Sequence, residues 1–300
     1  MTVTSCSSPS DSFDCQFDQL NLEESQARAF EQRHVYEIYD KIAGEFSDSR
    51  YRAWPNVKKF VEELAPGTIL VDLGTGNGKN LNLNKNIVSI GCDTSMNLLS
   101  ICRKNQYECL AANVLQLPFK DESIDACIFI AVLHHLANER RRLDALRNVV
   151  RMLKSGGQCL VYVWAFEQEL RGTKSSYIKQ KYDWKLEDTR CVPVELGESN
   201  GSVEGVDQDC DSKQHSNENP NRNATRLMPI HYNGTKFKHQ NCFVPWKKKN
   251  KEVPLEETDL RFYHLFKEGE LDVLLRRLDG VQIVDSFHDN GNWAVKFRKI

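Results

Sequence analysis

An acid followed by three glycines at alternate positions is the part of this sequence with the most chemical content. It reads Asp72-Leu-Gly74-Thr-Gly76-Asn-Gly78 and directly follows the apolar residues 69–71. Glycine is needed where the backbone turns sharply and approaches a ligand closely, because a Cβ atom would fill that space. Asp72 precedes the turn, where its carboxylate can meet a ligand's ammonium group. A dinucleotide site would place the third glycine one position later, and a turn that binds no ligand is the other alternative.

A second acid and an amide follow at the ends of the next two predicted strands. Asp93 comes 21 residues after Asp72 and can accept hydrogen bonds from both ribose hydroxyls of a nucleoside. Asn113 follows the third strand, where its carbonyl oxygen can accept a hydrogen bond from an adenine amino group. Acids at strand ends also occur by chance, but the combination with the glycine turn favours a nucleoside cofactor.

Two histidines and a tryptophan mark the same edge of the predicted sheet. The fourth strand runs into His134-His135, and the fifth strand ends at Trp164. Because the carboxyl ends of parallel strands form the ligand crevice, these side chains are expected to face the reaction. One of the two histidines is expected to be structural, and the sequence does not say which.

The chain carries an acidic and a basic part that the net charge of −2 conceals. Residues 1–25 and 195–212 hold eleven acids and no base, and without them the remainder has a net charge of +9. The run Arg50-Tyr51-Arg52-Ala-Trp54 interleaves cations with aromatic rings, which suits phosphate contact and base stacking. The lysines at 236–238 and 247–249 suit either backbone contact with a nucleic acid or a solvated loop.

The elements that would position these residues alternate along the chain. Helical spacing of apolar residues predicts a helix over 24–44 and a second over 54–64. Strands and helices then alternate, which favours a parallel, doubly wound sheet, and Asp289-Asn-Gly291 predicts a hairpin turn near the end. Ser95 is expected to cap a helix and the Ser-Gly-Gly at 155–157 to end one. The predicted strands are 69–73, 87–92, 108–112, 124–130, 158–164, 281–287 and 292–298, with helices 95–103, 139–153 and 267–278 between them.

Two segments fall outside this pattern. Residues 1–24 are expected to form a disordered acidic tail, since they contain too little apolar content to pack. The domain would then span 25–300, interrupted by a flexible insertion at about 169–255 that lacks periodicity.

Composition restricts the class of protein further. The N-terminus has no basic and apolar signal segments, and no apolar run approaches the roughly 20 residues of a membrane span. The ten cysteines include no C-x-x-C pair, so no metal site is predicted. We expect a cytoplasmic, and also nuclear, protein with reduced thiols and no membrane partner.

The acid and glycines of 72–78 resemble motif I of the S-adenosylmethionine (SAM) methyltransferases. The resemblance implies a Rossmann-like class I fold, with a seven-stranded, mostly parallel sheet and a C-terminal antiparallel hairpin strand. It implies SAM as cofactor, with Tyr39 or Tyr36 covering the sulfonium through a cation–π attraction of roughly 0.5–2 kcal/mol. Simple helix packing is the alternative for both tyrosines. The implied cofactor-binding residues are Tyr39, Asp72, Gly74, Gly76, Gly78, Asp93, Asn113, Val114 and Ile130.

Longer motifs resemble the eukaryotic tRNA wobble-uridine (5-carboxymethyluridine) methyltransferases over residues 26–300. They include residues 34–47, 50–55, 130–135, 162–168, Val244-Pro-Trp246, 261–271 and Asp289-Asn-Gly-Asn292-Trp293. Residues 227–237 are more similar to the methyltransferase half of the eighth AlkB homologue. The resemblance implies methyl transfer from SAM to the carboxylate of 5-carboxymethyluridine at the tRNA wobble position, which gives a methyl ester. It also implies a small zinc-containing activator subunit as a heterodimer partner, and no DNA partner.

The implied chemistry needs few catalytic groups. A carboxylate with a pKa of roughly 4 is already ionised at neutral pH, so the enzyme has to align the reactants and exclude water. Arg50, His134 and His135 are the catalytic candidates, with Arg50 or a histidine orienting the carboxylate. The substrate-binding candidates are Arg50, Tyr51, Arg52, Trp54, Trp164, Arg261, Tyr263, His264, Asn292 and Trp293.

Several positions depart from the family pattern, namely Thr75, Asn80, Thr94, Asn113, Phe262 and His288. Asn113 and the acidic insertion leave open a catalytically weak paralogue that acts as a SAM-sensing or protein-binding regulator. A second alternative is a small-molecule methyltransferase of the same fold. Its activity would not respond to salt, whereas tRNA binding weakens steeply as salt rises.

Overall fold

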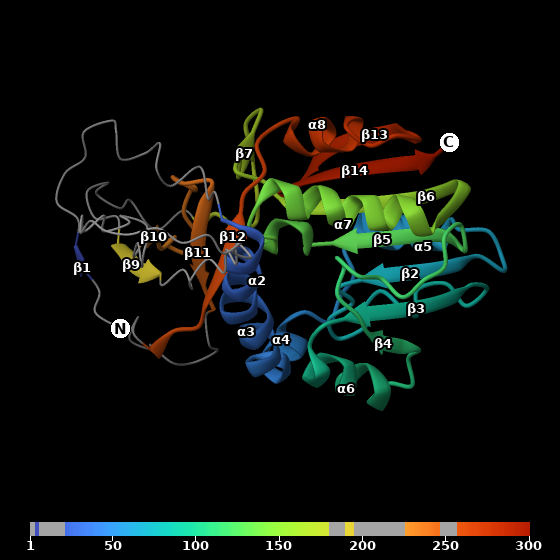
Figure 1. The fold of residues 1–300 in the computed structure, drawn as a ribbon, viewed down its shortest axis with the longest axis horizontal. Coiled ribbons are helices and arrows are strands. Elements are labelled where there is room, and N and C mark those ends of the chain that lie inside the picture. Colours follow the sequence, from blue (N-terminus) through green and yellow to red (C-terminus); the bar gives the residue numbers. More distant parts are fainter. Residues whose placement is uncertain (1–3, 6–21, 180–189, 195–225, 247–256) are drawn as a thin grey trace, which may run out of the picture.

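The computed structural model describes residues 4–5, 22–179, 190–194, 226–246 and 257–300 of the 300-residue chain. Its centre is a seven-stranded sheet in the order β13-β14-β6-β5-β2-β3-β4 (Figure 1). Neighbours from β6 to β4 are parallel, and β14 runs antiparallel to both β6 and β13. This confirms the predicted fold class. The strands are β2 (Ile69–Leu73), β3 (Val88–Asp93), β4 (Cys109–Ala111), β5 (Ile124–Ile130), β6 (Leu153–Trp164), β13 (Val281–Asp289) and β14 (Asn292–Lys299).

Helices cover both faces of this sheet because successive strand residues point to opposite sides. On one face, Cys127 and Phe129 of β5 pack in a core with α7 (Glu139–Met152) and α8 (Glu270–Arg276). On the other face, Ala126 and Ile128 pack with α5 (Pro55–Glu62), which begins with proline at its first position. At the sheet edge, α6 (Met96–Lys104) lies against β4.

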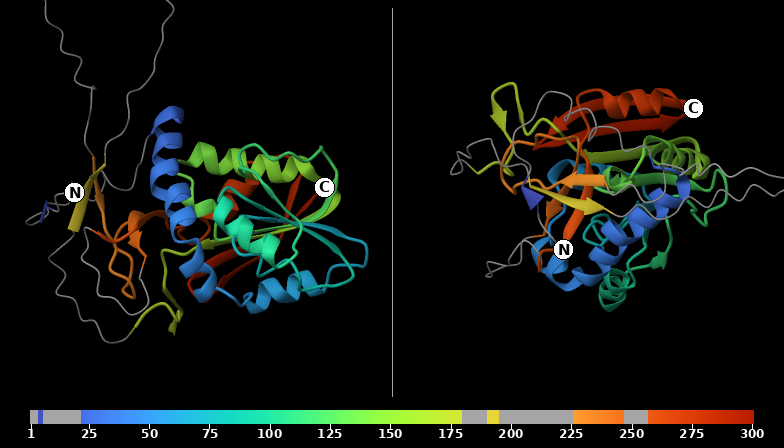
Figure 2. Two further views of the ribbon diagram at one scale, coloured as in Figure 1. Left: turned by 90° about the horizontal axis from the view of Figure 1, so that it is seen from below. Right: turned by 60° about the vertical axis from the view of Figure 1, so that its left-hand side comes forward.

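The N-terminal helices stand at the carboxyl ends of the strands. Figure 1 shows them across the ends of β2, β3 and β5, and Figure 2 shows the same arrangement from below. The single helix predicted over 24–44 is wrong in detail, because a π-helical turn interrupts it. A π turn adds a residue to the helical turn, rotates the following side chains, and often occurs at functional sites. The segment consists of α2 (Glu24–Glu31), the π turn η1 (Gln32–Tyr36), α3 (Glu37–Lys41) and α4 (Ala43–Ser49).

Most predicted boundaries agree with the structure to within a few residues. Ser95 caps α6, since its Oγ accepts a hydrogen bond from the Leu98 amide at 3.1 Å. The hairpin turn is also confirmed, with positive φ at Asn290 (47°) and Gly291 (82°). The predicted helix stop at 155–157 is wrong. β6 already pairs with β5 at Leu153, so residues 155–157 lie inside β6. They lie next to a shift in the register between β5 and β6.

The insertion contains more regular structure than its sequence pattern predicted. Within its described parts lie β7 (Glu169–Leu170), β8 (Thr173–Lys174), β9 (Arg190–Val194), β10 (Arg226–Pro229) and β11 (Asn241–Pro245). β11 pairs along its whole length with β12 (Leu260–His264), and its Phe243 packs 6.1 Å from Phe30 of α2. These contacts join the insertion to the N-terminal helices. The expected tail lies mostly outside the described residues, apart from β1 (Thr4–Ser5), which pairs with β9, and residues 22–24. The acidic segment 195–212 and the lysines 247–249 also lie outside them.

The described residues contain no helix suited to crossing a membrane and no disulfide bond. Within the described ranges, no helix combines the length and apolar character needed to cross a bilayer. The cysteines of these ranges are all free thiols, and most of them are buried.

Candidate functional site

The glycine turn forms the floor of a cavity of about 160 Å³. Gly74 and Gly76 line it with positive φ angles of 69° and 58°, conformations that side chains rarely adopt. A Cβ on Gly74 would lie 2.1 Å from Val132 Cγ2, and one on Gly76 would lie 3.2 Å from the Phe46 ring. Gly78 was predicted to contact the ligand, but it does not line this cavity. A Cβ there would meet Tyr107 at 2.6 Å, so that glycine allows close packing of the turn instead.

Asp72 lies beneath the turn with one carboxylate oxygen left unsatisfied. Its side chain is 1% exposed, and Oδ2 accepts hydrogen bonds from Thr75 Oγ1 at 3.0 Å and Asn80 Nδ2 at 3.4 Å. Oδ1 is buried without a partner. Burial raises the pKa of this carboxyl from 3.8 to about 7. An ammonium group bound at the turn would satisfy the free oxygen and favour the ionised form, so these residues fit the amino-acid end of SAM.

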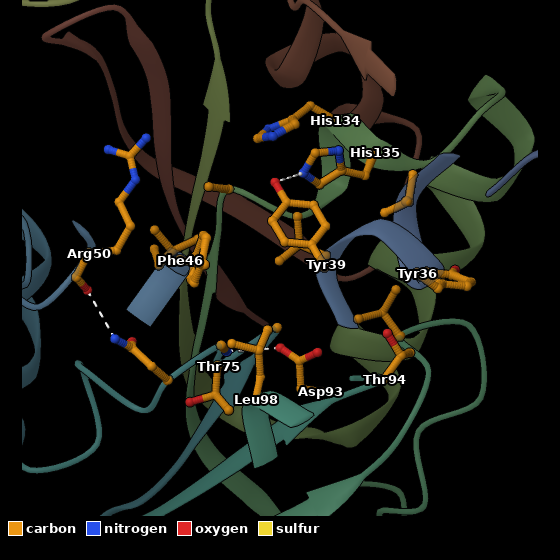
Figure 3. A pocket seen from close by; sticks show the side chains of 18 of the residues that line it. Tyr36, Tyr39, Phe46, Arg50, Thr75, Asp93, Thr94, Leu98, His134 and His135 are labelled. Carbon is orange, nitrogen blue, oxygen red and sulfur yellow. Dashed lines mark hydrogen bonds between the residues drawn. The ribbon is translucent and has the colours of Figure 1, made fainter. Parts of the chain in front are cut away.

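Asp93 lines the cavity and is held by the backbone. Its Oδ2 accepts the Gly76 amide hydrogen at 2.8 Å (Figure 3). Its Oδ1 accepts the Ser95 amide hydrogen at 2.9 Å. Burial raises the pKa of this carboxyl, and the backbone hydrogen bonds counteract part of the shift. Since a carboxylate offers about four acceptor positions, these backbone contacts leave capacity to accept from a ribose hydroxyl.

Asn113 lines the cavity with its amide already engaged. Its Oδ1 accepts the Leu115 amide hydrogen at 2.9 Å, and its Nδ2 donates to the Tyr36 hydroxyl at 3.3 Å. The oxygen predicted to accept from adenine therefore has one acceptor position left rather than two. Val114 and Ile130 also line the cavity, as predicted, and supply apolar surface.

The two histidines differ in how their ring nitrogens are used. His135 Nδ1 donates to the Phe262 carbonyl at 2.7 Å, which leaves Nε2 to accept from the Tyr39 hydroxyl at 3.0 Å (Figure 3). His134 Nδ1 accepts the Trp164 amide hydrogen at 3.3 Å, so its proton resides on Nε2, which is buried without a partner. Burial lowers the pKa of His135 to about 3 and that of His134 well below its usual value. Both rings are neutral, and His134 is the one with a free donor.

A second cavity of about 650 Å³ adjoins the first. Arg50, Trp54, Trp164 and Arg261 line both cavities. Arg50 is exposed at the mouth, whereas Arg261 is buried beside Tyr263, which lines the first cavity. The second cavity is further lined by Asn292 and by aromatic and amide side chains of the insertion, among them Tyr177, Asn233 and Trp246.

Neither Asp72 nor Gly78 lines a cavity wall, and four further predicted site residues lie elsewhere. Tyr51 is 67% exposed, and Arg52 lies 5.4 Å from its ring, so both stand outside the cavities. His264 points to Asn241 and Glu270, with hydrogen bonds of 2.9 and 2.6 Å. Trp293 donates its indole hydrogen to Glu167 at 3.0 Å. These contacts are structural.

Some residues of the cavity walls had no role predicted from the sequence, among them Phe46, Trp246 and Lys79. Phe46 lines the first cavity, and Trp246 lines the second and donates to Glu45 at 3.0 Å. Lys79 lines the first cavity, where burial lowers its pKa, and its Nζ lies 5.4 Å from the Trp54 ring. Phe46 and Trp246 lie within the motifs that carry the family resemblance, which was the available signal.

Known proteins are similar to this chain in sequence and in fold. A family model described as "Methyltransferase domain" matches residues 71–161. The chain is 38% identical to the tRNA (carboxymethyluridine(34)-5-O)-methyltransferase ALKBH8 of Macaca fascicularis, over 92% of this chain and 45% of that protein. It is 32% identical to the Saccharomyces cerevisiae tRNA (carboxymethyluridine(34)-5-O)-methyltransferase, over 91% of this chain and 99% of that protein. The chain thus spans about half the length of the ALKBH8 relatives but nearly all of the yeast protein.

A solved structure agrees at the level of the fold. An S-adenosylmethionine-dependent methyltransferase from Clostridium acetobutylicum superimposes with a TM-score of 0.52 at 11% identity, over 87% of this chain and 98% of that one. The methyltransferase domain and its site residues together identify S-adenosylmethionine as the cofactor. The chain belongs to the tRNA (carboxymethyluridine(34)-5-O)-methyltransferase family.

Proposed function

We propose that this chain transfers a methyl group from SAM to the carboxylate of 5-carboxymethyluridine at the tRNA wobble position, forming the methyl ester. The observation that carries the proposal is the wall that the two cavities share, which combines Arg50 and Arg261 with Trp54 and Trp164. A methyl donor in the first cavity and a splayed-out base in the second would meet at this wall. Aromatic rings suit an unstacked base, and guanidinium groups suit a carboxylate.

The residues of the chain would act mainly by positioning. When bound, SAM supplies an electrophilic methyl group on a sulfonium sulfur. The glycine turn and Asp72 would bind its amino-acid end, and Asp93 its ribose, which fixes the direction in which the methyl group points. The acceptor carboxylate is ionised at neutral pH, so no base is needed. The lowered pKa values of His134 and His135 keep both rings neutral, so neither adds a charge that would overstabilise the ground state.

A catalytically weak, SAM-sensing paralogue is the second candidate function, favoured by the engaged amide of Asn113. It predicts SAM affinity in the millimolar range or none, whereas the enzyme should bind SAM at physiological concentrations. A small-molecule methyltransferase of the same fold would work equally well at low and high salt.

We also propose tRNA and a small zinc-containing activator as partners, in the cytoplasm and also the nucleus. The support for the activator and for the location is the sequence resemblance. Co-expression with the activator, followed by size-exclusion chromatography, tests whether a one-to-one complex forms.

The decisive assay uses purified protein, labelled SAM and tRNA that carries 5-carboxymethyluridine, with and without the activator. We expect label to enter the tRNA and to leave under mild alkali, as a methyl ester must. The same tRNA with an unmodified wobble uridine is the matched control and should take up no label. If SAM binds and the activator is present but no label enters, the enzyme hypothesis fails and the regulator becomes the better explanation.

A further inference from the structure

Arg261 is a buried cation without an anionic partner among the described residues. It lies on β12, is 5% exposed, and its Nη1 donates to the Tyr39 hydroxyl at 3.3 Å. Its Nε is buried and makes no hydrogen bond. The guanidinium lies 4.9 Å from the Trp246 ring, 5.3 Å from Tyr263 and 5.7 Å from Tyr39. Aromatic rings attract the charge but do not neutralise it.

A second buried arginine in the same protein shows what a purely structural arginine looks like here. Arg141 is 3% exposed, and its Nε and Nη2 donate to the two carboxylate oxygens of Glu31 at 2.8 and 2.7 Å. A buried charge is normally compensated in this way, because an unpaired one loses its hydration without gaining a partner. Arg142 also has a buried Nε without a hydrogen bond, but its Nη1 donates to the Leu136 carbonyl at 2.9 Å and it lines neither cavity. Arg261 lines both cavities, so a ligand carboxylate could reach it and supply the anion that it lacks.

The position of Arg261 specifies where that ligand would bind. Its side chain lines both cavities, so it stands between the cofactor and the second cavity. Three acids line the second cavity, and none of them forms an ion pair with Arg261 in the described part of the chain. Glu45 accepts from Trp246 at 3.0 Å, and Asp289 accepts from Tyr162 at 2.8 Å. The Tyr39 hydroxyl accepts the hydrogen bond from Nη1 and lies 3.3 Å from the Tyr263 hydroxyl, so it holds one side of the guanidinium in place. The Nε–H group makes no hydrogen bond and is available to an anion.

We propose that Arg261 binds the carboxylate that accepts the methyl group and thereby distinguishes the acid from its ester and its amide, an inference that rests on the proposed function. In the transfer, a carboxylate oxygen forms the new C–O bond as the S–CH₃ bond breaks, and the bonding pair stays on sulfur. The carboxylate and the sulfonium both lose their charge, and no proton moves. The ester no longer pairs with Arg261, so the product is released and does not compete with new substrate.

The test compares binding of three anticodon stem-loop RNAs to the full chain, in complex with its activator if one is required. They carry 5-carboxymethyluridine, its methyl ester or its amide at the wobble position. We expect the wild type to bind the acid most tightly and Arg261→Gln to bind all three RNAs alike. In a methyl-transfer assay with the acid, the KM of Arg261→Gln should rise about 100-fold. SAM affinity should be unchanged. Arg190→Gln is the matched control, because Arg190 also lies near a tyrosine ring, 5.9 Å from Tyr232, but outside both cavities.

Each outcome decides the question. An Arg261→Gln variant that binds SAM normally and still prefers the acid overturns the assignment. If that variant loses SAM binding because it is misfolded, Arg261→Lys decides, since lysine keeps the charge but lacks the planar fork of donors. We expect KM to rise at least about 10-fold there, and an unchanged KM refutes the assignment. A wild-type enzyme that esterifies none of the RNAs instead refutes the proposed function itself.

Discussion

Replacing Asp72 by asparagine should stabilise the ligand-free protein at neutral and alkaline pH while abolishing SAM binding. Asparagine has the same shape and can still accept from Thr75, but it carries no charge that has to be buried. The wild-type carboxylate is 1% exposed, with Oδ1 unsatisfied. The chain therefore tolerates a destabilising group at the position where an ammonium is expected to bind.

The size of the effect follows from the raised pKa. The carboxyl titrates at about 7 in the folded protein, against 3.8 in the unfolded chain. Between these values the folded state holds a proton that the unfolded state has released, so stability falls as the pH rises. A shift of about three pH units corresponds to about 4 kcal/mol. The free energy of unfolding of Asp72→Asn does not fall in this way. The difference in this free energy between the variant and the wild type should therefore grow from pH 4 to pH 7 and then remain constant.

Urea unfolding of the ligand-free proteins at pH 5, 6, 7 and 8 measures this advantage. Asp285→Asn, at an exposed aspartate of β13, is the matched control and should show no such trend. Calorimetry with SAM should give binding for the wild type and the control but not for Asp72→Asn. Since the ligand's ammonium favours the ionised carboxylate, wild-type binding at pH 6 should also release a proton. A difference between wild type and variant that does not change with pH would refute this reasoning, as would normal SAM affinity in Asp72→Asn.

Three further predictions concern the elements that hold the site. Glu31→Gln removes the buried anion of Arg141, whose other carboxylate partner Glu24 is exposed, and should lower the free energy of unfolding by about 3–5 kcal/mol, measured with urea. Gly74→Ala should abolish SAM binding, and Gly74→Ala with Val132→Ala should restore part of it if the 2.1 Å overlap is the cause. His134→Ala should lower kcat and leave SAM affinity unchanged. His135→Ala should lower kcat and also weaken SAM binding, because it removes the hydrogen-bond partner of Tyr39. Equal effects of the two substitutions on SAM affinity would contradict these roles. Neither histidine should give a pH dependence of kcat between pH 6 and 9.

The sheet could be predicted because its signals are local. The glycine turn, the Ser95 cap and the Asn290-Gly291 hairpin each depend on a few neighbouring residues whose backbone preferences are strong. The site residues at strand ends could be placed for the same reason, since parallel strands bring their carboxyl ends to one edge. Asp93 and Asn113 accordingly line the same cavity.

The parts that were missed depend on contacts between distant segments. β11 and β12 are five residues each, too short for their period to be recognised, and each pairs with residues of the other that lie 15 or more positions away in the chain. Recognition of β12 as a strand would have corrected the prediction that His264 binds substrate, because alternate residues of a strand share a face. Arg261 and Tyr263 then face the cavities together, and His264 must face away, as it does. The π turn at 32–36 has no comparable sequence signal.

Two buried charges near the glycine turn and the cavities, those of Asp72 and Arg261, are complementary to the two charges of the proposed reaction. Asp72 has a buried oxygen without a donor, and Arg261 has a buried nitrogen without an acceptor. Glu31 and Arg141 pair directly, whereas Arg142 also has a buried Nε without a hydrogen bond but lines neither cavity. What distinguishes Asp72 and Arg261 is their place, since Asp72 directly precedes the glycine turn and Arg261 lines both cavities. The first fits the ammonium of SAM and the second fits a carboxylate. A substrate without a carboxylate would leave Arg261 uncompensated, which is the physical reason to expect an acid as the acceptor rather than an amine or a hydroxyl.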